Sequence, residues 1–185
     1  MFAGKKSAQI REILINESAW EEMTCLFAPS LTLPLLSIAK GIGYGNTKWD
    51  MNPSEVVAAQ GNGAHLISSE KYKDNFGKVR IDNVSIGSGL YTVTFLFNSA
   101  DRLVQTNVAS NEKKNEGIAA SQFSTLSQLL TQKYGKPEFS DSDKATWKLP
   151  DTTVELSQLV ISGIMAQTVV RYIPNSRVAS DTSNL

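Results

Sequence analysis

The sequence contains few of the residues that build metal sites and nucleophilic active sites. Its 185 residues include one cysteine, Cys25, and one histidine, His65. An intramolecular disulfide is therefore impossible, and a zinc site, which needs about four ligands that are usually Cys and His, cannot form in the typical way. Cys25 lies in an apolar stretch without the surroundings that activate a thiol, which argues against a Cys–His nucleophile. We predict no metal and no cofactor.

The sequence also lacks an excess of charge of either sign. Lys plus Arg and Asp plus Glu number 18 each, so the formal net charge is zero. Nucleic-acid binding normally requires a basic field, because phosphate contacts supply most of the affinity. We therefore predict no nucleic-acid partner. The hydrophobic fraction of 41% is sufficient for a packed core.

Catalytic candidates are correspondingly weak. Asp141 and Asp143 point the same way in an extended chain, as paired carboxylates would, but they lie in a Ser/Asp segment. Solvated turn residues are the preferred interpretation, with weak cation binding as the alternative. His65 follows a glycine-rich loop and has no nucleophile elbow nearby. We predict that the protein is not an enzyme and has no catalytic residues.

Residues 26–39 form an uncharged apolar segment near the start of the chain. The segment is shorter than the roughly 20 residues of a membrane-spanning helix, and it contains Pro29 and Pro34. Its length fits the apolar core of a secretory signal, and Ser37 and Ala39 have the spacing that signal peptidase accepts. We predict a leader over residues 1–43, with a folded element or a membrane anchor as alternatives.

The first helix-start signal of the body is the string Asn52-Pro53-Ser54-Glu55. Asn52 is suited to cap the helix, Pro53 to occupy its first turn, and Glu55 to complete a capping box. Alternating residues then predict strands over 79–86, with a bulge near Asn83, and over 91–97 and 104–108.

A second helix is predicted from an apolar stripe that ends at Tyr134. Gly135 suits the left-handed cap position and Pro137 blocks continuation. Strands are expected near 145–149, over 153–159 and over 164–172, and residues 174–185 are expected to form a disordered tail.

These segments predict an α+β fold in which a helix laid on an antiparallel meander occurs twice. The order α-β-β-β is repeated within a domain over 44–173, in units 44–110 and 118–173. Whether the second unit continues the sheet of the first is left open.

Four residues are candidates for a binding surface. Trp49 stands just before the first helix cap and Trp147 opens the second set of strands; for both, core packing is the first interpretation and exposed recognition the second. Thr92 and Thr94 alternate with the apolar residues of the strand over 91–97, which predicts a solvated sheet face that a partner could cover.

Two strings resemble known segments. Lys48-Trp49-Asp50-Met51-Asn52-Pro53-Ser54-Glu55-Val56 is similar to the opening of small exported bacterial domains, which include the BamE/SmpA outer-membrane assembly lipoproteins and the beta-lactamase-inhibitor-protein-like repeats. Leu130-Thr131-Gln132-Lys133-Tyr134-Gly135-Lys136-Pro137, followed by Trp147, resembles a segment of uncharacterised periplasmic proteins. The resemblance covers residues 44–173.

The resemblance implies a non-enzymatic protein of the bacterial envelope that binds another envelope protein. We therefore expect a periplasmic or secreted interaction or inhibitor module, with a small-ligand or lipid carrier as the alternative function. Membrane association is expected only through residues 26–39, and a cytoplasmic or membrane-anchored location is the alternative to export.

Overall fold

The computed structural model describes residues 41–61 and 63–181, which belong to one compact unit, Ile38–Leu185. The predicted leader therefore falls almost wholly outside the described residues. Among those residues, no helix is long and apolar enough to cross a membrane. The elements, in chain order, are α1 (Pro53–Gln60), β1 (Ala64–Tyr72), β2 (Asn75–Ile86), β3 (Gly89–Phe97), β4 (Leu103–Ser110), α2 (Glu116–Tyr134), β5 (Phe139–Ser140), β6 (Lys144–Lys148), β7 (Thr152–Ile161), β8 (Met165–Pro174) and α3 (Asn175–Asp181).

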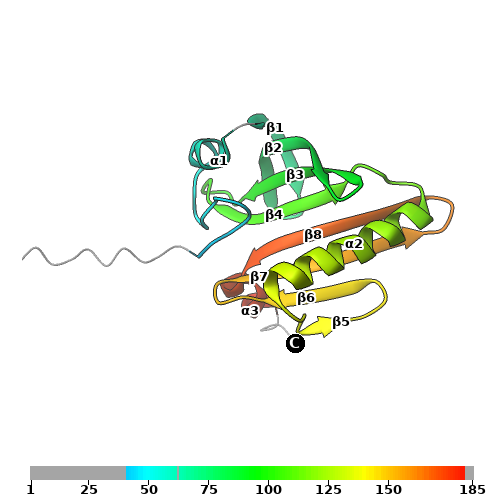
Figure 1. Ribbon diagram of the computed structural model, residues 1–185. Helices are drawn as coiled ribbons and strands as arrows, with labels where there is room; N and C mark the ends of the chain where they lie inside the picture. The colour runs from blue at the N-terminus through cyan, green and yellow to red at the C-terminus, as the bar shows by residue number, and fades with distance from the viewer. Residues whose placement is uncertain (1–40, 62, 182–185) are drawn as a thin grey trace, which may run out of the picture. The chain divides into compact units, whose positions relative to one another are not determined.

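All eight strands form one antiparallel sheet in the order β1-β2-β3-β4-β8-β7-β6-β5 (Figure 1). The prediction of two helix-plus-meander units is therefore wrong, although the α+β character is present. The reason is the pairing of β4 with β8, in which Val108 lies opposite Val170 and both side chains are buried. Two separate meanders would leave these apolar strands as unpaired edges, which is unfavourable.

The sequence interpretation missed strand β1. Its segment, Ala64–Tyr72, is mostly polar and only partly buried, and its register with β2 shifts between Leu66 and Glu70. The irregularity breaks the alternation by which strands are recognised. The two-residue strand β5 was also missed, so each of the first two helices is followed by four strands rather than three.

Several local predictions are confirmed. Asn52 caps α1, and the capping box with Glu55 is formed in both directions. The register of β2 shifts between Ile81 and Val84, and Asn83 has a positive φ of 55° there. Helix α2 ends at Tyr134 as predicted, but Gly135 follows with a φ of 86° and a ψ of −167°, so it has a positive φ without the left-handed helical cap conformation. Seven residues of the segment expected to be a disordered tail form helix α3 instead.

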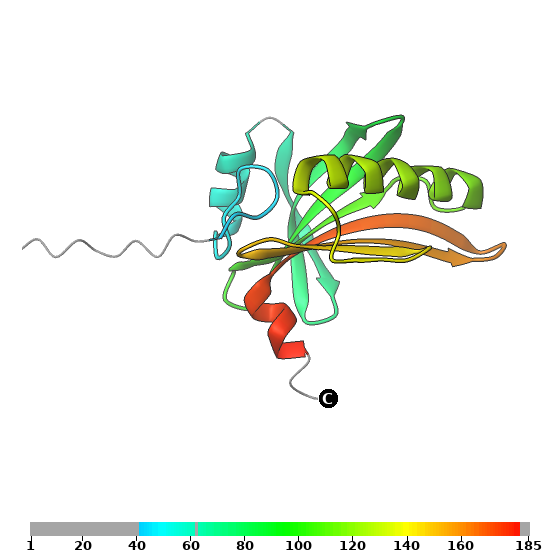
Figure 2. The same cartoon turned by 60° about the horizontal axis from the view of Figure 1, so that its bottom comes forward.

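The hydrophobic core lies on the face of the sheet that α1 and α2 cover. In Figure 2 helix α2 runs across that face. Val56 of α1 and Leu126 and Leu130 of α2 belong to the same buried cluster as the apolar residues of β2, β3, β4, β6, β7 and β8. The opposite face of the sheet carries no such layer from α1 or α2, and it is there that the candidate site lies.

Candidate functional site

A row of directly opposed polar residues crosses the sheet from β1 to β6. Residues that face each other across an antiparallel ladder point to the same side of the sheet. We call this set the polar row: His65, Arg80, Thr94, Asn107, Arg171, Glu155 and Thr146. We call the side of the sheet on which it lies the polar face.

The neighbouring row, one residue along each strand, is buried and mostly apolar. It points to the helices and consists of Val79, Phe95, Thr106, Tyr172, Val154 and Trp147. All six of these residues are buried. Because the side-chain period of a strand is two, the buried row fixes the register and thereby fixes which side chains stand in the polar row.

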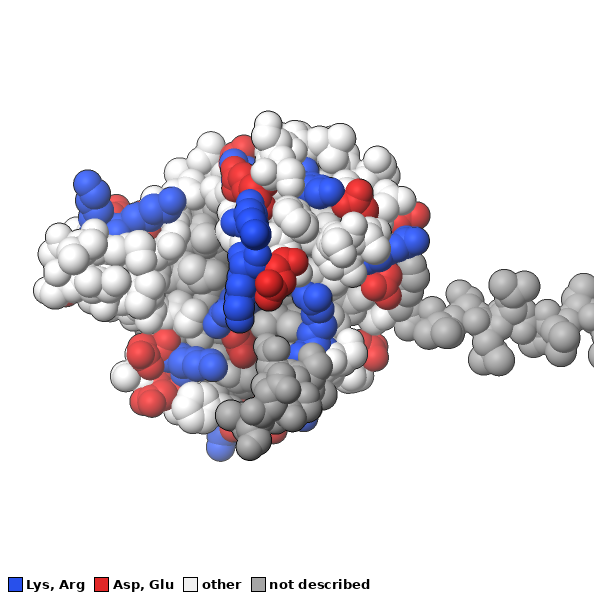
Figure 3. Space-filling view, turned by 180° about the vertical axis from the view of Figure 1, so that it is seen from behind, with Lys and Arg blue, Asp and Glu red and all other residues white. Residues whose placement is uncertain are grey.

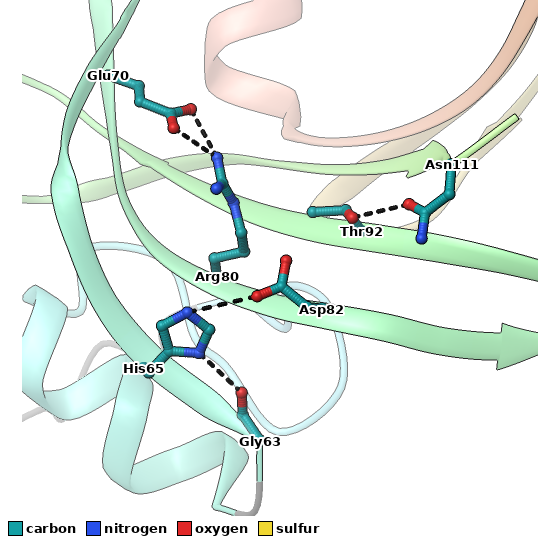
Figure 4. A network of polar contacts seen from close by, with 7 residues as sticks. All are labelled: Gly63, His65, Glu70, Arg80, Asp82, Thr92 and Asn111. Atoms are coloured by element: carbon teal, nitrogen blue, oxygen red, sulfur yellow. Dashed lines mark hydrogen bonds and ion pairs between the residues drawn. The ribbon is translucent and has the colours of Figure 1, made fainter. Parts of the chain in front are cut away.

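The first charged cluster of the polar face surrounds Arg80. Its Nη2 donates to both carboxylate oxygens of Glu70 at 2.7 Å, and the Tyr72 hydroxyl donates to the same carboxylate at 3.0 Å. The hydrogen bond from Arg80 is the main cause that holds the pKa of Glu70 below its usual range. Figure 4 shows the Arg80 guanidinium reaching toward Glu70, with Asp82 and His65 beside its stem. The carboxylate and the guanidinium therefore hold each other in one orientation.

The second charged cluster lies farther along the same row. Nη2 of Arg171 is 3.0 Å from Oε2 of Glu155, and Nζ of Lys144 is 3.9 Å from Oε1 of the same carboxylate. Glu155 is only 17% exposed, so this anion is held largely out of solvent between two cations. Viewed from behind, the Lys and Arg side chains form a column across this face, with Asp and Glu beside them (Figure 3).

Neutral residues stand between the two clusters. Thr94 and Asn107 are the directly opposed members of the row there, and Gln105 donates to Oδ1 of Asn107 at 2.7 Å. To one side, Thr92 donates to Asn111 at 2.8 Å, as Figure 4 also shows. Thr94 is buried at 6% exposure, so the centre of the polar face offers the partly exposed amides of Gln105 and Asn107 and, to one side, the Thr92 hydroxyl.

The polar face is hollowed at two places. One cavity of about 440 Å³ is lined by Tyr72, Arg80, Asp82, Thr92, Thr94, Asn107, Ala109, Ser110, Asn111, Lys113, Gln167 and Val169. A second of about 530 Å³ is lined by Lys73, Asp74, Asn75, Gln105, Lys144, Glu155, Arg171, Ile173, Arg177 and Val178. The polar row contributes residues to both, so the two hollows are parts of one continuous surface.

The four predicted binding residues divide into two pairs. Thr92 and Thr94 lie on the polar face and line the first cavity. Trp49 and Trp147 are instead buried at 5% and 1% exposure, and their indole N–H groups donate to Thr152 and to the carbonyl of Gly135. The structure therefore brings the two threonines together and places both tryptophans in the core.

The residues considered for catalysis or cation binding, His65 and the pair Asp141 and Asp143, lie on different strands and turns. Both ring nitrogens of His65 face acceptors, with Nε2 3.5 Å from Asp82 and Nδ1 3.2 Å from the carbonyl of Gly63. Asp141 and Asp143 are exposed residues of the turn between β5 and β6, where Asp141 accepts a hydrogen bond from the Ser142 N–H. In the described part of the chain, no group of three or more His, Cys, Asp or Glu residues is placed to hold a metal ion.

Sequence reasoning missed the charged members of the polar row. The alternating pattern of residues 79–86 places Arg80 on the solvent side of a strand, but it gives no role to Arg80, Arg171 or Glu155. The available signal was alternation: each lies between two apolar residues of a strand, as Arg80 does between Val79 and Ile81. What alternation could not supply was the strand order that places these residues in one line.

Comparisons with known proteins yield no relative for this chain. A scan against protein-family models, a search of curated proteins and a search of solved structures each found no match. The resemblance to small exported bacterial domains therefore stays a prediction.

Proposed function

We propose that the protein is a non-enzymatic interaction module that binds a partner protein across the polar face of its sheet. The observation that carries this proposal is the polar row, in which one polar side chain from each of seven adjacent strands stands on the face opposite α1 and α2. Side chains on a hydrogen-bonded sheet are held in place before binding, which lowers the entropy cost of association.

The charge pattern of this face favours a protein partner over a nucleic acid. Arg80 is bonded to Glu70, and Arg171 is bonded to Glu155, so each arginine of the row already has a carboxylate beside it. A phosphate backbone would have to compete with these carboxylates and would gain little from counterion release. A polar protein surface needs only hydrogen-bond donors and acceptors, which the central threonine and amide residues supply.

The carrier hypothesis has less support, because the space between helix and sheet is filled. Leu126 and Leu130 of α2 pack in one cluster with Tyr91, Phe95 and Trp147 of the sheet, and all five are buried. A small ligand would instead have to occupy an open cavity, such as the one of about 440 Å³ on the polar face or the one of about 380 Å³ that Tyr134, Leu149 and Tyr172 help to line. Native mass spectrometry of gently purified protein separates these hypotheses, because a carrier retains its ligand and an interaction module does not.

We further propose that the module acts in the bacterial envelope, as an exported binding or inhibitor protein. This proposal rests on the apolar segment at residues 26–39 and on the resemblance of residues 44–173 to exported domains. Determination of the mature N-terminus in fractionated cells tests it: a start at Lys40 in the soluble envelope fraction supports export, and a start at Met1 in the cytosol contradicts it.

Site-specific photo-crosslinking tests the binding surface. A photoreactive amino acid at Thr92, on the polar face, should give a discrete crosslinked product with one partner protein in extracts of the host. The matched control carries the same group at Ser124, an exposed residue of α2 on the opposite side of the sheet. We expect the Thr92 product to be at least tenfold more abundant, because only the polar face meets the partner.

Two results of the crosslinking experiment would contradict the proposal. The first is a discrete product from Ser124 with none from Thr92, which would place the partner on the helix side. The second is a small molecule bound in the native mass spectrum together with no product from either position, which would favour the carrier function.

A further inference from the structure

The outer end of the β7–β8 hairpin extends beyond the strands on both sides of it. Pairing of β6 with β7 reaches Ser157, and pairing of β4 with β8 begins at Val169. The four pairs beyond that point, from Gln158 opposite Thr168 to Ile161 opposite Met165, join β7 and β8 alone. Figures 1 and 2 show this end of the hairpin as the far tip of the sheet.

The tip exposes apolar side chains in three directions. Leu159 and Ile161, 51% and 44% exposed, point to the polar face, and Val160, 41% exposed, points to the helix side. Ile164 in the turn is 72% exposed. A two-stranded ribbon in water normally carries polar residues on its solvated sides. The apolar residues of this tip are therefore suited to contact with an apolar environment.

Charged residues are absent from the outer part of the hairpin but lie beside it. The sequence has no Asp, Glu, Lys or Arg from Leu156 through Val170. Lys113 and Lys114 are exposed beside it, and the carbonyl of Lys113 accepts a 2.8 Å hydrogen bond from the N–H of Ala166. Figure 3 shows the protruding lobe as largely uncharged, with Lys and Arg atoms at its upper border and Asp and Glu atoms together with basic atoms below it.

Acidic groups of the same loop are arranged differently from the lysines. Oε1 of Glu112 accepts hydrogen bonds from the backbone N–H groups of Lys113, Lys114 and Asn115 at 3.1, 2.9 and 3.0 Å. These bonds hold the carboxylate against its own loop. Glu116 is exposed in the first turn of α2, where a carboxylate is favoured by the helix dipole. The lysine ammonium groups, on long flexible stems, are therefore the charges best able to reach past the loop.

We propose that the tip of the β7–β8 hairpin inserts into the headgroup region of an anionic lipid bilayer, with Lys113 and Lys114 contacting lipid phosphates. A protein partner with a flat surface would cover one side of the tip, whereas a lipid surface surrounds all three apolar sides at once. The uncharged stretch meets the requirement that charge stay out of the hydrocarbon region, and basic residues at the boundary are attracted to anionic headgroups.

Insertion is shallow in this arrangement. The outer edges of β7 and β8 beyond Ser157 and Val169 have no strand neighbour, so most of their outward backbone groups need water. The tip therefore enters only the interfacial layer, as monotopic proteins do. The tip belongs to a different part of the sequence from the apolar segment 26–39 of the predicted leader, and the inference does not depend on the proposed partner binding.

Vesicle co-sedimentation of the full chain tests the proposal. On vesicles of phosphatidylcholine and phosphatidylglycerol in a 7:3 ratio, Ile164→Asp should lower binding at least tenfold. The matched control is Leu66→Asp, since Leu66 is 61% exposed on β1, and it should change binding less than twofold. Lys113→Gln combined with Lys114→Gln should weaken binding to these vesicles and leave binding to pure phosphatidylcholine nearly unchanged.

A second readout keeps the test independent of any folding defect. Ile164→Trp should show a blue-shifted emission on the anionic vesicles, and Leu66→Trp should not. Equal vesicle binding by Ile164→Asp and the unchanged chain would overturn the proposal and assign membrane binding to another segment, such as residues 26–39. Self-association that Ile164→Asp abolishes, without vesicle binding by the unchanged chain, would also overturn it and assign the tip to a second copy.

Discussion

Replacement of Trp147 by alanine is expected to reduce the free energy of unfolding by about 3–5 kcal/mol, the usual range for a fully buried aromatic residue. The side chain is 1% exposed and packs in the cluster that contains Leu126 and Leu130 of α2. Its Nε1 also donates to the carbonyl of Gly135, the residue that ends that helix. The substitution removes both the packing and the hydrogen bond that tie α2 to β6, and urea denaturation measures the loss.

Trp147→Phe is the control that separates these two contributions. It keeps most of the ring packing but lacks the N–H donor, so it should cost clearly less than the alanine variant. A loss below about 1 kcal/mol for Trp147→Ala would contradict the assignment of this residue to the core. Such a result would return Trp147 to the list of surface binding candidates.

Replacement of Val170 by aspartate is expected to unfold the whole sheet. Val170 is 2% exposed, lies opposite Val108 of β4, and lies opposite Leu156 of β7 on its other side. An aspartate at this position, where β8 pairs with β4 and β7, must either carry its charge into an apolar environment or become protonated, and either costs several kcal/mol. Because one sheet contains all eight strands, amide hydrogen exchange should accelerate in β1–β3 and in β5–β7 together.

The neighbouring residue supplies a matched control. Val169 lies in the same strand and opposite Ala109 of β4, but its side chain points to the polar face and is only half-buried. Val169→Asp should therefore leave the amide protection against hydrogen exchange largely intact in β1–β3 and in β5–β7. Loss of protection in β5–β8 alone, after Val170→Asp, would show two independently stable units and would contradict the single sheet.

The parts of the fold that sequence could predict are those set by local chemistry. The capping box of Asn52 and Glu55, the glycine after α2 and the bulge at Asn83 all depend on residues within a few positions of each other. The pairing of β4 with β8 depends on residues about 60 positions apart, and no local pattern encodes it. Strand β1 was missed because its bulge interrupts alternation and its burial is slight.

The candidate site shows the same division. Alternation within β3 was enough to place Thr92 and Thr94 on the polar face, but only Thr92 is partly exposed there, because Thr94 is buried at 6% exposure. It could not show that Thr94 stands in line with Arg80 and Arg171, because that line is a property of strand order. For the two tryptophans the sequence favours core packing over exposed recognition without excluding either, and their burial and indole hydrogen bonds place both in the core.

The central claim is that the polar face is the surface that meets a partner protein. Its most direct test is the dissociation constant of the crosslinked partner for three chains: the unchanged protein, Asn107→Arg and Ser124→Arg. Asn107 stands in the polar row between Thr94 and Arg171, and Ser124 is exposed on α2. An arginine at position 107 adds bulk and charge at the centre of the row, so we expect at least tenfold weaker binding, with Ser124→Arg unchanged. Unchanged affinity for Asn107→Arg together with lost affinity for Ser124→Arg would contradict the claim.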